Sequence, residues 1–297
     1  MPETSIIIPF YNRINWTIEA ILSVVNQTYK DIEIIVIDDG SEDEYGEAIK
    51  QLDSRIKYFK QSKQGPSSAR NLGIRNASGM FIAFLDSDDL FEPQKLEVQI
   101  RIMKENPSAL MTHSSYTQID VSGNILDLIH SGLFSGEVYP KIYSHCPIAT
   151  PTVVIRKEVV KSILFDEDIR VAEDIILWGS IAKKTKILGI DASLTKVRIH
   201  GENAAQDVRK QMEGSKNIIA FVLSKGNNLS LMERNKIVSD HYLNLAYFSS
   251  KQKQIMRTLS YFILSFLYWP VNQKIFIHLI KYVIPKSVRS KIMRIIK

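Results

Sequence analysis

Three carboxylates follow directly on an apolar segment that ends at residue 85. The segment 80–85 has no charge and is typical of a buried parallel strand, and Asp86, Asp88 and Asp89 come at its end. Ligands of open α/β sheets bind in the crevice beyond the strand ends, where Asp86 and Asp88 are predicted to project. Clustered anions need a counter-charge, and oxygen ligands suit Mg²⁺ or Mn²⁺. The pattern therefore predicts a divalent metal that holds a diphosphate.

The alternative for this Asp-X-Asp pattern is structural. Asp and Ser are common turn residues, which could end the strand and cap a helix near Pro93. A second acidic turn, Asp38-Asp39-Gly40-Ser41, follows another apolar stretch at 32–37. Two acidic strand ends in one domain favour a shared ligand crevice over two unrelated turns.

The composition is that of a globular protein. With 297 residues, 45% of them hydrophobic, the chain has room for one large domain and an appendage. Cys146 is the only cysteine, so an intrachain disulfide is excluded. The amino terminus lacks the pattern of a signal peptide, and a reducing, cytoplasmic setting is expected.

The net charge of +6 is distributed unevenly along the chain. After Asp240 there is no acidic residue, and this segment contains ten lysines and arginines. The first 240 residues carry 28 Lys and Arg against 32 Asp and Glu, a net charge of −4. A mildly acidic body is therefore followed by a strongly basic tail.

Short apolar runs alternate with amphipathic segments over the first half of the chain, as in βαβ units. This alternation predicts an α/β fold with a mostly parallel central sheet, flanking helices and a helical, basic C-terminal extension. We expect loops and short strands that receive the substrate over 117–150. The predicted strands are 5–10, 32–37, 56–59, 80–85, 109–115, 152–156 and 194–199. The predicted helices are 14–25, 42–52, 64–79, one beyond Pro93 through Met103, one ending at Ile163 and one within 165–184.

Six ordered motifs over residues 4–205 resemble the family 2 glycosyltransferases of the bacterial surface-polysaccharide type, which have the Rossmann-like, A-type nucleotide-sugar-binding fold. The resemblance implies a nucleotide-sugar domain at 1–205, with a donor half at about 1–115 and an acceptor half at about 116–205. The motifs are Ser5-Ile6-Ile7-Ile8-Pro9-Phe10-Tyr11-Asn12, Asp38-Asp39-Gly40-Ser41, the Gly65 to Gly73 segment, Asp86-Ser87-Asp88, Glu173-Asp174 and Arg198-Ile199-His200.

The resemblance implies a donor site at the first two strand ends. Asp39 would accept a hydrogen bond from the nucleobase, and Pro9 and Tyr11 would form the base pocket, as suits the imide N–H and ring of uracil. Asp39 could instead belong only to a turn. Arg70 is expected to meet phosphate or sugar oxygens or to brace Asp86, and the sequence leaves both interpretations open.

The resemblance also implies a divalent metal cofactor, Mn²⁺ or Mg²⁺. Asp86 is expected to contact the ribose and orient the metal, while Asp88 and His200 are expected to bind it. The metal would neutralise the charge that develops on the leaving diphosphate. Asp89 is expected to cap the following helix and to have no catalytic role.

Glu173 and Asp174 precede an amphipathic segment, where acids also have a plain explanation in the helix dipole. In the family that the chain resembles, the second acid of this pair is the general base, which corresponds to Asp174. One in-line displacement would invert the anomeric configuration. Trp178, one turn later, could stack on an acceptor sugar or belong to the core.

The C-terminal region, 206–297, is expected to be helical. The uncharged run 258–273 is shorter than the roughly 20 residues of a membrane span. Residues 286–297 combine an aliphatic face with bordering basic residues, a pattern that indicates an interfacial helix on anionic lipid. For 258–284 the sequence favours packing on the body and binding to lipid equally. Nucleic-acid binding is not expected, because the basic residues alternate with aliphatic ones.

These observations predict an inverting transferase that moves a sugar from a UDP-sugar to a glycan or lipid-linked oligosaccharide on the inner face of the cell membrane. A nucleotidyltransferase is one alternative, although the Gly-rich basic loop expected after its first strand is replaced by Pro9-Phe10-Tyr11-Asn12. A non-catalytic, nucleotide-binding membrane adaptor is another. The sequence does not determine the oligomeric state.

Overall fold

The computed structural model describes residues 1–201, 203, 206–224 and 228–272. The chain divides into two compact units, Met1–Asn203 and Ala204–Lys297. The predicted boundary between residues 205 and 206 lies next to this division.

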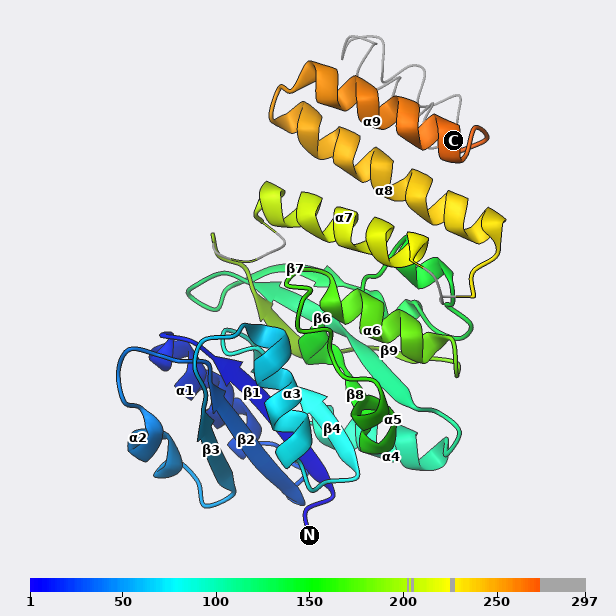
Figure 1. The fold of residues 1–297 in the computed structure, drawn as a ribbon. Coiled ribbons are helices and arrows are strands. Elements are labelled where there is room, and N and C mark those ends of the chain that lie inside the picture. The colour runs from blue at the N-terminus through cyan, green and yellow to red at the C-terminus, as the bar shows by residue number, and fades with distance from the viewer. Residues whose placement is uncertain (202, 204–205, 225–227, 273–297) are drawn as a thin grey trace. The chain divides into compact units, whose positions relative to one another are not determined.

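A parallel four-stranded half-sheet forms the start of the first unit (Figure 1). Its order is β3 (Ile56–Lys60), β2 (Ile32–Asp38), β1 (Thr4–Phe10), β4 (Phe81–Phe84). Every residue of β1, β2 and β4 is buried, which explains why β-branched and aromatic residues predominate in these strands. The carboxyl ends of these strands meet at one edge of the sheet and bring the two acidic turns to it.

Helices cover both faces of this half-sheet. Helices α1 (Ile14–Val25), α2 (Gly46–Lys50) and α4 (Lys95–Glu105) pack on the face that includes Ile6, Ile34 and Ala83. Helix α3 (Pro66–Asn76) packs on the opposite face, where Gly73 lies against Ile7. There, Phe84 also meets Phe165 and Trp178, so Trp178 is a core residue and does not stack on a sugar.

The remaining strands complete a nine-stranded sheet of order β3-β2-β1-β4-β8-β6-β9-β5, with β7 paired to β6. β8 is antiparallel to both β4 and β6, whereas β6 and β9 are parallel. Helices α5 (Lys157–Ser162) and α6 (Glu173–Ala182) follow β8. This arrangement confirms the α/β fold with flanking helices. The strand bounds are β5 Leu90–Phe91, β6 Met111–Ile119, β7 Ile125–Ile129, β8 Val154–Arg156 and β9 Leu188–Arg198.

Several predicted bounds were wrong. The helix predicted over 42–52 is the five-residue α2, and the helix predicted over 64–79 ends at Asn76, because Ala77 is extended. Gly79 follows in a tight approach to β1, where an added Cβ would lie 2.7 Å from the Ser5 backbone nitrogen. The strands predicted at 109–115 and 194–199 belong to the longer β6 and β9, whose Ser and Thr hydroxyls bond across the strands.

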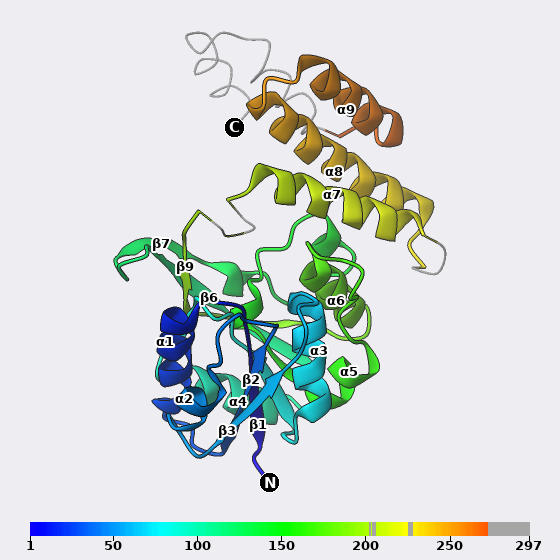
Figure 2. The same ribbon diagram turned by 60° about the vertical axis from the view of Figure 1, so that its left-hand side comes forward.

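The second unit contains three helices in its described part, α7 (Val208–Leu223), α8 (Leu231–Lys251) and α9 (Ile255–Tyr268). Ser230 and Glu233 form a capping box at the start of α8. Helices α8 and α9 run side by side (Figures 1 and 2). Leu243, Ala246 and Phe262 form a small buried cluster between them. Within the described residues, none of the helices has the length and apolar character needed to cross a membrane. The predicted interfacial helix 286–297 lies outside the described residues.

Candidate active site

The turn that follows β4 holds the three predicted carboxylates. Leu85 continues the sheet by donating its N–H to the Ile7 carbonyl, and the Asp89 N–H then bonds to the Asp86 carbonyl at 3.0 Å and closes the turn. Asp86 and Asp88 are partly exposed, whereas Asp89 is buried. The turn therefore presents two carboxylates at the surface and keeps the third inside.

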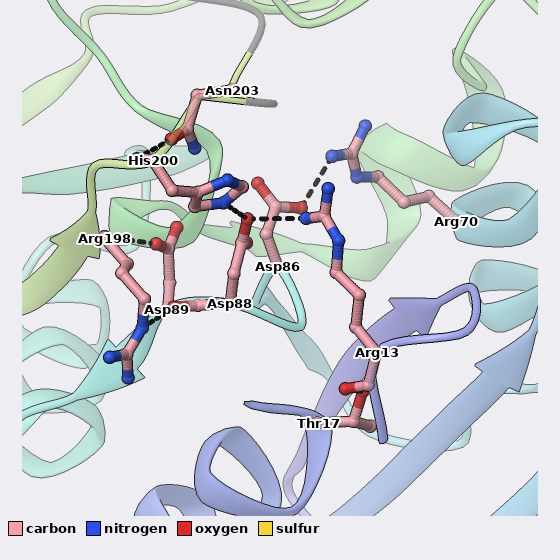
Figure 3. Close-up of polar contacts among 9 residues, drawn as sticks. All are labelled: Arg13, Thr17, Arg70, Asp86, Asp88, Asp89, Arg198, His200 and Asn203. Carbon is pink, nitrogen blue, oxygen red and sulfur yellow. Dashed lines mark hydrogen bonds and ion pairs between the residues drawn. The ribbon is translucent and has the colours of Figure 1, made fainter. Parts of the chain in front are cut away.

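Asp88 lies between a histidine and an arginine (Figure 3). One oxygen, Oδ2, lies 2.7 Å from His200 Nε2 and 3.0 Å from Arg13 Nη1. His200 follows the end of β9, and Arg13 is the residue before α1. The His200 ring also packs on Trp16 of α1, with 4.8 Å between ring centroids. Two predicted metal-binding residues, 112 positions apart in the chain, are thus in contact.

Arg198 fixes the acidic turn to the end of β9. Its backbone N–H donates to Asp89 Oδ1 at 2.8 Å, and its Nε donates to the Asp88 carbonyl at 3.0 Å. The prediction that Asp89 caps the following helix was wrong, because the residue before α4 is Gln94. Burial raises the pKa of Asp89 well above its ordinary value, and the charges of Asp88 and Asp86 raise it further.

Arg70 lies in the first turns of α3 and connects two acidic segments, one with Asp86 and one with Glu173. Its Nη2 lies 2.7 Å from Asp86 Oδ1, and its Nη1 lies 2.9 Å from Glu173 Oε1. The side chain is buried, and although burial lowers its pKa, the charges of Asp86 and Glu173 outweigh burial and raise it. Of the two interpretations of Arg70, the structure shows the one in which it braces Asp86.

Asp174 lies in the first turn of α6, after Ala172 in a left-handed conformation (φ 69°). Its Oδ2 accepts a hydrogen bond from Thr150 Oγ1 at 3.2 Å, and its Oδ1 accepts one from the Ile175 N–H. Burial raises the pKa of Asp174; Arg70 opposes this shift and Asp86 adds to it. Burial and the Asp174 charge likewise raise the pKa of Glu173. A carboxylate with a raised pKa is a stronger base, which suits proton abstraction.

The predicted base-binding residues lie at the ends of β1 and β2. Asp39 is buried, and its carboxylate accepts bonds of 2.8 Å from Gln61 Nε2 and from the backbone N–H groups of Gln64 and Gly65. Asp39 therefore fixes the loop that leads into α3, whereas the structural alternative offered by the sequence was a place in a turn. Tyr11 carries Lys63 Nζ over its ring, and Pro9 is buried in β1.

The donor atoms of Asp88 and His200 fit a hard divalent cation. Across the described residues, no three His, Cys, Asp or Glu side chains converge in a metal-binding arrangement. Mg²⁺ and Mn²⁺ commonly take one or two protein ligands and complete their shell with water and substrate phosphates. Asp88 and His200 supply an oxygen and a nitrogen of the kinds that such a cation takes, and in this structure the two atoms are hydrogen-bonded to each other at 2.7 Å.

The fold thus gathers the predicted residues into two groups. Asp88 and His200 form one, and Asp86, Arg70 and the first turn of α6 form the other, while Pro9, Tyr11 and Asp39 lie at neighbouring strand ends. The sequence analysis missed Arg13 and gave Glu173 no separate role. A basic residue shortly after the first strand was the one available signal for Arg13.

Sequence comparison finds one matching family, described as glycosyl transferase family 2, over residues 5–164. The uncharacterized glycosyltransferase RC0461 of Rickettsia conorii is 52% identical over 225 residues, which cover 75% of this chain. WfaP of Escherichia coli, named a UDP-Glc:alpha-D-GlcNAc-diphosphoundecaprenol beta-1,3-glucosyltransferase, is 33% identical over 77% of this chain and 90% of its own length. The match covers 37%, 37% and 32% of the length of three Rickettsia relatives.

Two solved structures show the same fold. S. aureus TarS 1-349 in complex with UDP-GlcNAc has a TM-score of 0.66 at 19% identity, covering 93% of this chain and 83% of that chain. The mannosyltransferase PcManGT of Pyrobaculum calidifontis, in complex with GDP-Man and Mn²⁺, has a TM-score of 0.60 at 12% identity, covering 92% and 88%. The A-type glycosyltransferase fold expected from the motifs is therefore confirmed.

Proposed function

The chain belongs to glycosyl transferase family 2, and from this premise we propose that it transfers a sugar from a nucleotide diphosphate sugar, a UDP-sugar, to a hydroxyl group of an acceptor. The observation that carries the proposal is the contact between Asp88 and His200 at the end of the strand β4, next to Asp86, which Arg70 links to the start of α6. The names of WfaP and of the TarS complex support uridine as the base.

In the proposed donor site, Tyr11 and Asp39 receive the nucleobase and Asp86 faces the ribose. The Asp39 carboxylate makes three hydrogen bonds to the loop 61–65, which leaves it one of about four acceptor positions. Arg70 holds Asp86 through one oxygen, Oδ1, so that Oδ2 is available to a ribose hydroxyl. Asp88 and His200 would hold a divalent cation, which would supply charge neutralisation for the departing diphosphate.

Asp174 is the proposed general base. It takes the proton from the acceptor hydroxyl while that oxygen attacks the anomeric carbon on the face opposite the diphosphate. The bond between the anomeric carbon and the diphosphate oxygen breaks as the glycosidic bond forms, so one displacement inverts the configuration. The hydrogen bond from Thr150 and the N–H of Ile175 orient the carboxylate for this step.

The proposed acceptor is a glycan or a lipid-linked oligosaccharide in the synthesis of a cell-surface polysaccharide. The diphosphoundecaprenol acceptor in the name of WfaP supports this choice, because that relative matches over 90% of its length. The basic tail supports peripheral attachment to an anionic membrane surface, since an enzyme with a membrane-bound acceptor gains effective concentration there.

Calorimetric titration tests the donor site. UDP, GDP and dTDP are titrated with and without Mn²⁺ into the wild-type protein and the Asp88→Asn variant. We expect Mn²⁺-dependent binding of UDP that is lost in the variant. Binding of GDP or dTDP in place of UDP would overturn the assignment of the base, and binding that is unchanged in the variant would overturn the metal site.

Turnover tests the general base separately. Asp174→Asn is expected to lower kcat by roughly 10²- to 10⁴-fold while UDP affinity stays within about threefold, because the base acts on the acceptor. Asp168→Asn, an exposed carboxylate in the loop before α6, is the matched control. Undiminished biological function in Asp174→Asn would support the non-catalytic adaptor instead.

A further inference from the structure

Helix α9 exposes an apolar stripe. Successive helical residues are about 100° apart, so Ile255, Leu259, Ile263, Phe266, Leu267 and Met256 fall within an arc of about 120°. All six side chains are exposed. Contiguous exposed apolar surface on this scale marks an interaction site, whereas single exposed apolar residues are ordinary.

The side of α9 that packs on α8 is comparatively polar. Ser265 Oγ donates to the Ser239 carbonyl at 2.9 Å, and Thr258 Oγ1 bonds to the Gln254 carbonyl. Phe262 is the one large apolar residue of α9 that is buried against Leu243 and Ala246. Tyr261 and Tyr268 of α9 also stack on Tyr242 of α8. The helix therefore packs on α8 through hydroxyls and aromatic rings, and its exposed aliphatic stripe takes no part in that contact.

Positive charge lies near the start of the helix that carries the stripe. Lys251 ends α8, Lys253 lies in the connection to α9 and Arg257 is in the first turn of α9, and all three are exposed. Arg257 donates to Gln254, and Lys251 lies over the Tyr247 ring. No acidic residue occurs after Asp240. An exposed apolar stripe with basic neighbours has the character of a helix that lies in the headgroup region of an anionic bilayer.

We infer that the outward stripe of α9 is the surface through which this chain binds an anionic lipid bilayer. A second copy of the chain is the less suitable occupant, because a symmetric contact would bring two sets of like charges together without a compensating acid. This inference rests on the membrane association within the proposed function and names the surface responsible. It is independent of the sugar and of the general base.

Vesicle co-sedimentation tests the inference with the full-length chain. Vesicles of phosphatidylcholine with 30% phosphatidylglycerol are compared with pure phosphatidylcholine. The variant Ile263→Gln/Leu267→Gln is expected to bind the anionic vesicles at least tenfold more weakly than wild type. The matched control, Ile125→Gln/Leu126→Gln on β7, alters side chains that are 73% and 54% exposed, against 61% and 68% on α9, and is expected to bind as wild type.

A fluorescent label reports the contact itself. In a Cys146→Ser background, an environment-sensitive dye on Ile263→Cys is expected to shift its emission to the blue with anionic vesicles and to be quenched by spin-labelled lipid. The same dye on Ile125→Cys is expected to do neither. Circular dichroism and UDP titration confirm that each variant is folded and retains its donor site.

The remaining outcomes separate the hypotheses. Wild-type protein that binds no vesicle overturns both the membrane association and its surface. Equal vesicle binding by wild type and the α9 variant overturns the stripe and leaves the association intact. A blue-shifted dye without vesicles, or a change in oligomeric state in the α9 variant, shows that protein covers the stripe and overturns the inference. None of these outcomes bears on the proposed UDP binding or on sugar transfer in solution, which are tested separately.

Discussion

A single oxygen atom of Asp88, Oδ2, contacts the side chains of both His200 and Arg13. The Asp88 side chain is 12% exposed, and Arg13, which is 31% exposed, lies 3.0 Å away on the side opposite His200 (Figure 3). The Arg13 backbone is held in turn by Thr17, which donates to the Arg13 carbonyl from both Oγ1 and N–H. The guanidinium thus neutralises the carboxylate that we propose as a metal ligand, so arginine and metal compete for the same charge.

The Arg13→Gln variant is therefore expected to bind Mn²⁺ more tightly in the absence of nucleotide. The increase is expected to be roughly three- to tenfold, because a unit charge at a partly solvated site is worth on the order of 1 kcal/mol. Titration of free Mn²⁺ by electron paramagnetic resonance measures it. Arg75→Gln on the exposed side of α3 is the control. An unchanged Mn²⁺ affinity would show that Arg13 does not oppose the metal.

Helix α3 approaches the sheet closely through a glycine. A Cβ added at Gly73 would lie 2.4 Å from Ile7 Cγ2, so the position next to β1 has no room for a methyl group. The same helix carries Arg70 and Asn71, whose side chains reach Glu173 and the Phe165 carbonyl on distant segments. The position of α3 against the sheet therefore sets the position of the arginine at the site.

Gly73→Ala is expected to destabilise the protein by about 1–3 kcal/mol, the usual cost of overpacking a filled core, despite the better helix propensity of alanine. Urea unfolding followed by circular dichroism measures this. In an Ile7→Ala background the same substitution is expected to cost less, since the clashing methyl group is gone. Equal costs in both backgrounds would show that Ile7 is not the obstacle.

The elements predicted best from sequence are those whose burial leaves a regular pattern. Helix α1 matches its prediction at both ends, and β1 and β2 differ from theirs by one residue, because wholly buried strands leave continuous apolar runs. The long strands β6 and β9 were underestimated. Thr117 bonds to Ser193 and Ser115 bonds to Asp191 between them, and such polar pairs leave no apolar alternation to detect.

The sequence indicates the residue types at the candidate site but not the contacts between them. The carboxylates were predicted from their place after apolar strands, but the pairs that define the site join residues far apart in sequence. Arg70 and Glu173 are 103 positions apart, and Arg198 and Asp89 are 109 apart. Local patterns carry no information on such contacts, which exist only once the sheet order brings the strand ends together.

At the scale of the whole molecule, the two compact units differ in charge and surface. The sheet-containing unit carries the acidic strand ends, while the segment after Asp240 contains only basic ionisable groups apart from its tyrosines and histidines. The catalytic and lipid-binding properties that we propose therefore belong to different units. The stability of the protein with respect to pH, in contrast, depends on groups buried within the sheet-containing unit.

Asp89 and His113 give this stability opposite dependences on pH. Burial lowers the pKa of His113 from 6.5 to about 4 in the folded protein. Between these two pH values the unfolded chain binds more protons at His113 than the folded protein does. The free energy of unfolding therefore decreases as the pH falls from 6.5 to about 4. The pKa of Asp89 in the folded protein is raised above the ordinary carboxyl value of 3.8. Above pH 3.8 the folded protein therefore keeps a proton on Asp89 that the unfolded chain loses. The contribution of Asp89 to stability therefore falls as the pH rises toward its raised pKa.

Asp89→Asn is expected to raise the melting temperature relative to wild type by an amount that grows as the pH rises from 3.8, the ordinary carboxyl pKa, toward the raised pKa of Asp89. The amide oxygen still accepts the Arg198 N–H, while the cost of ionising a buried carboxyl beside Asp88 and Asp86, up to about 1.4 kcal/mol per pH unit within the window, is removed. Thermal unfolding at each pH measures the difference, in which the His113 contribution cancels because both proteins contain it. A pH-independent loss of stability would instead mean that Asp89 is ionised and stabilised by Arg198.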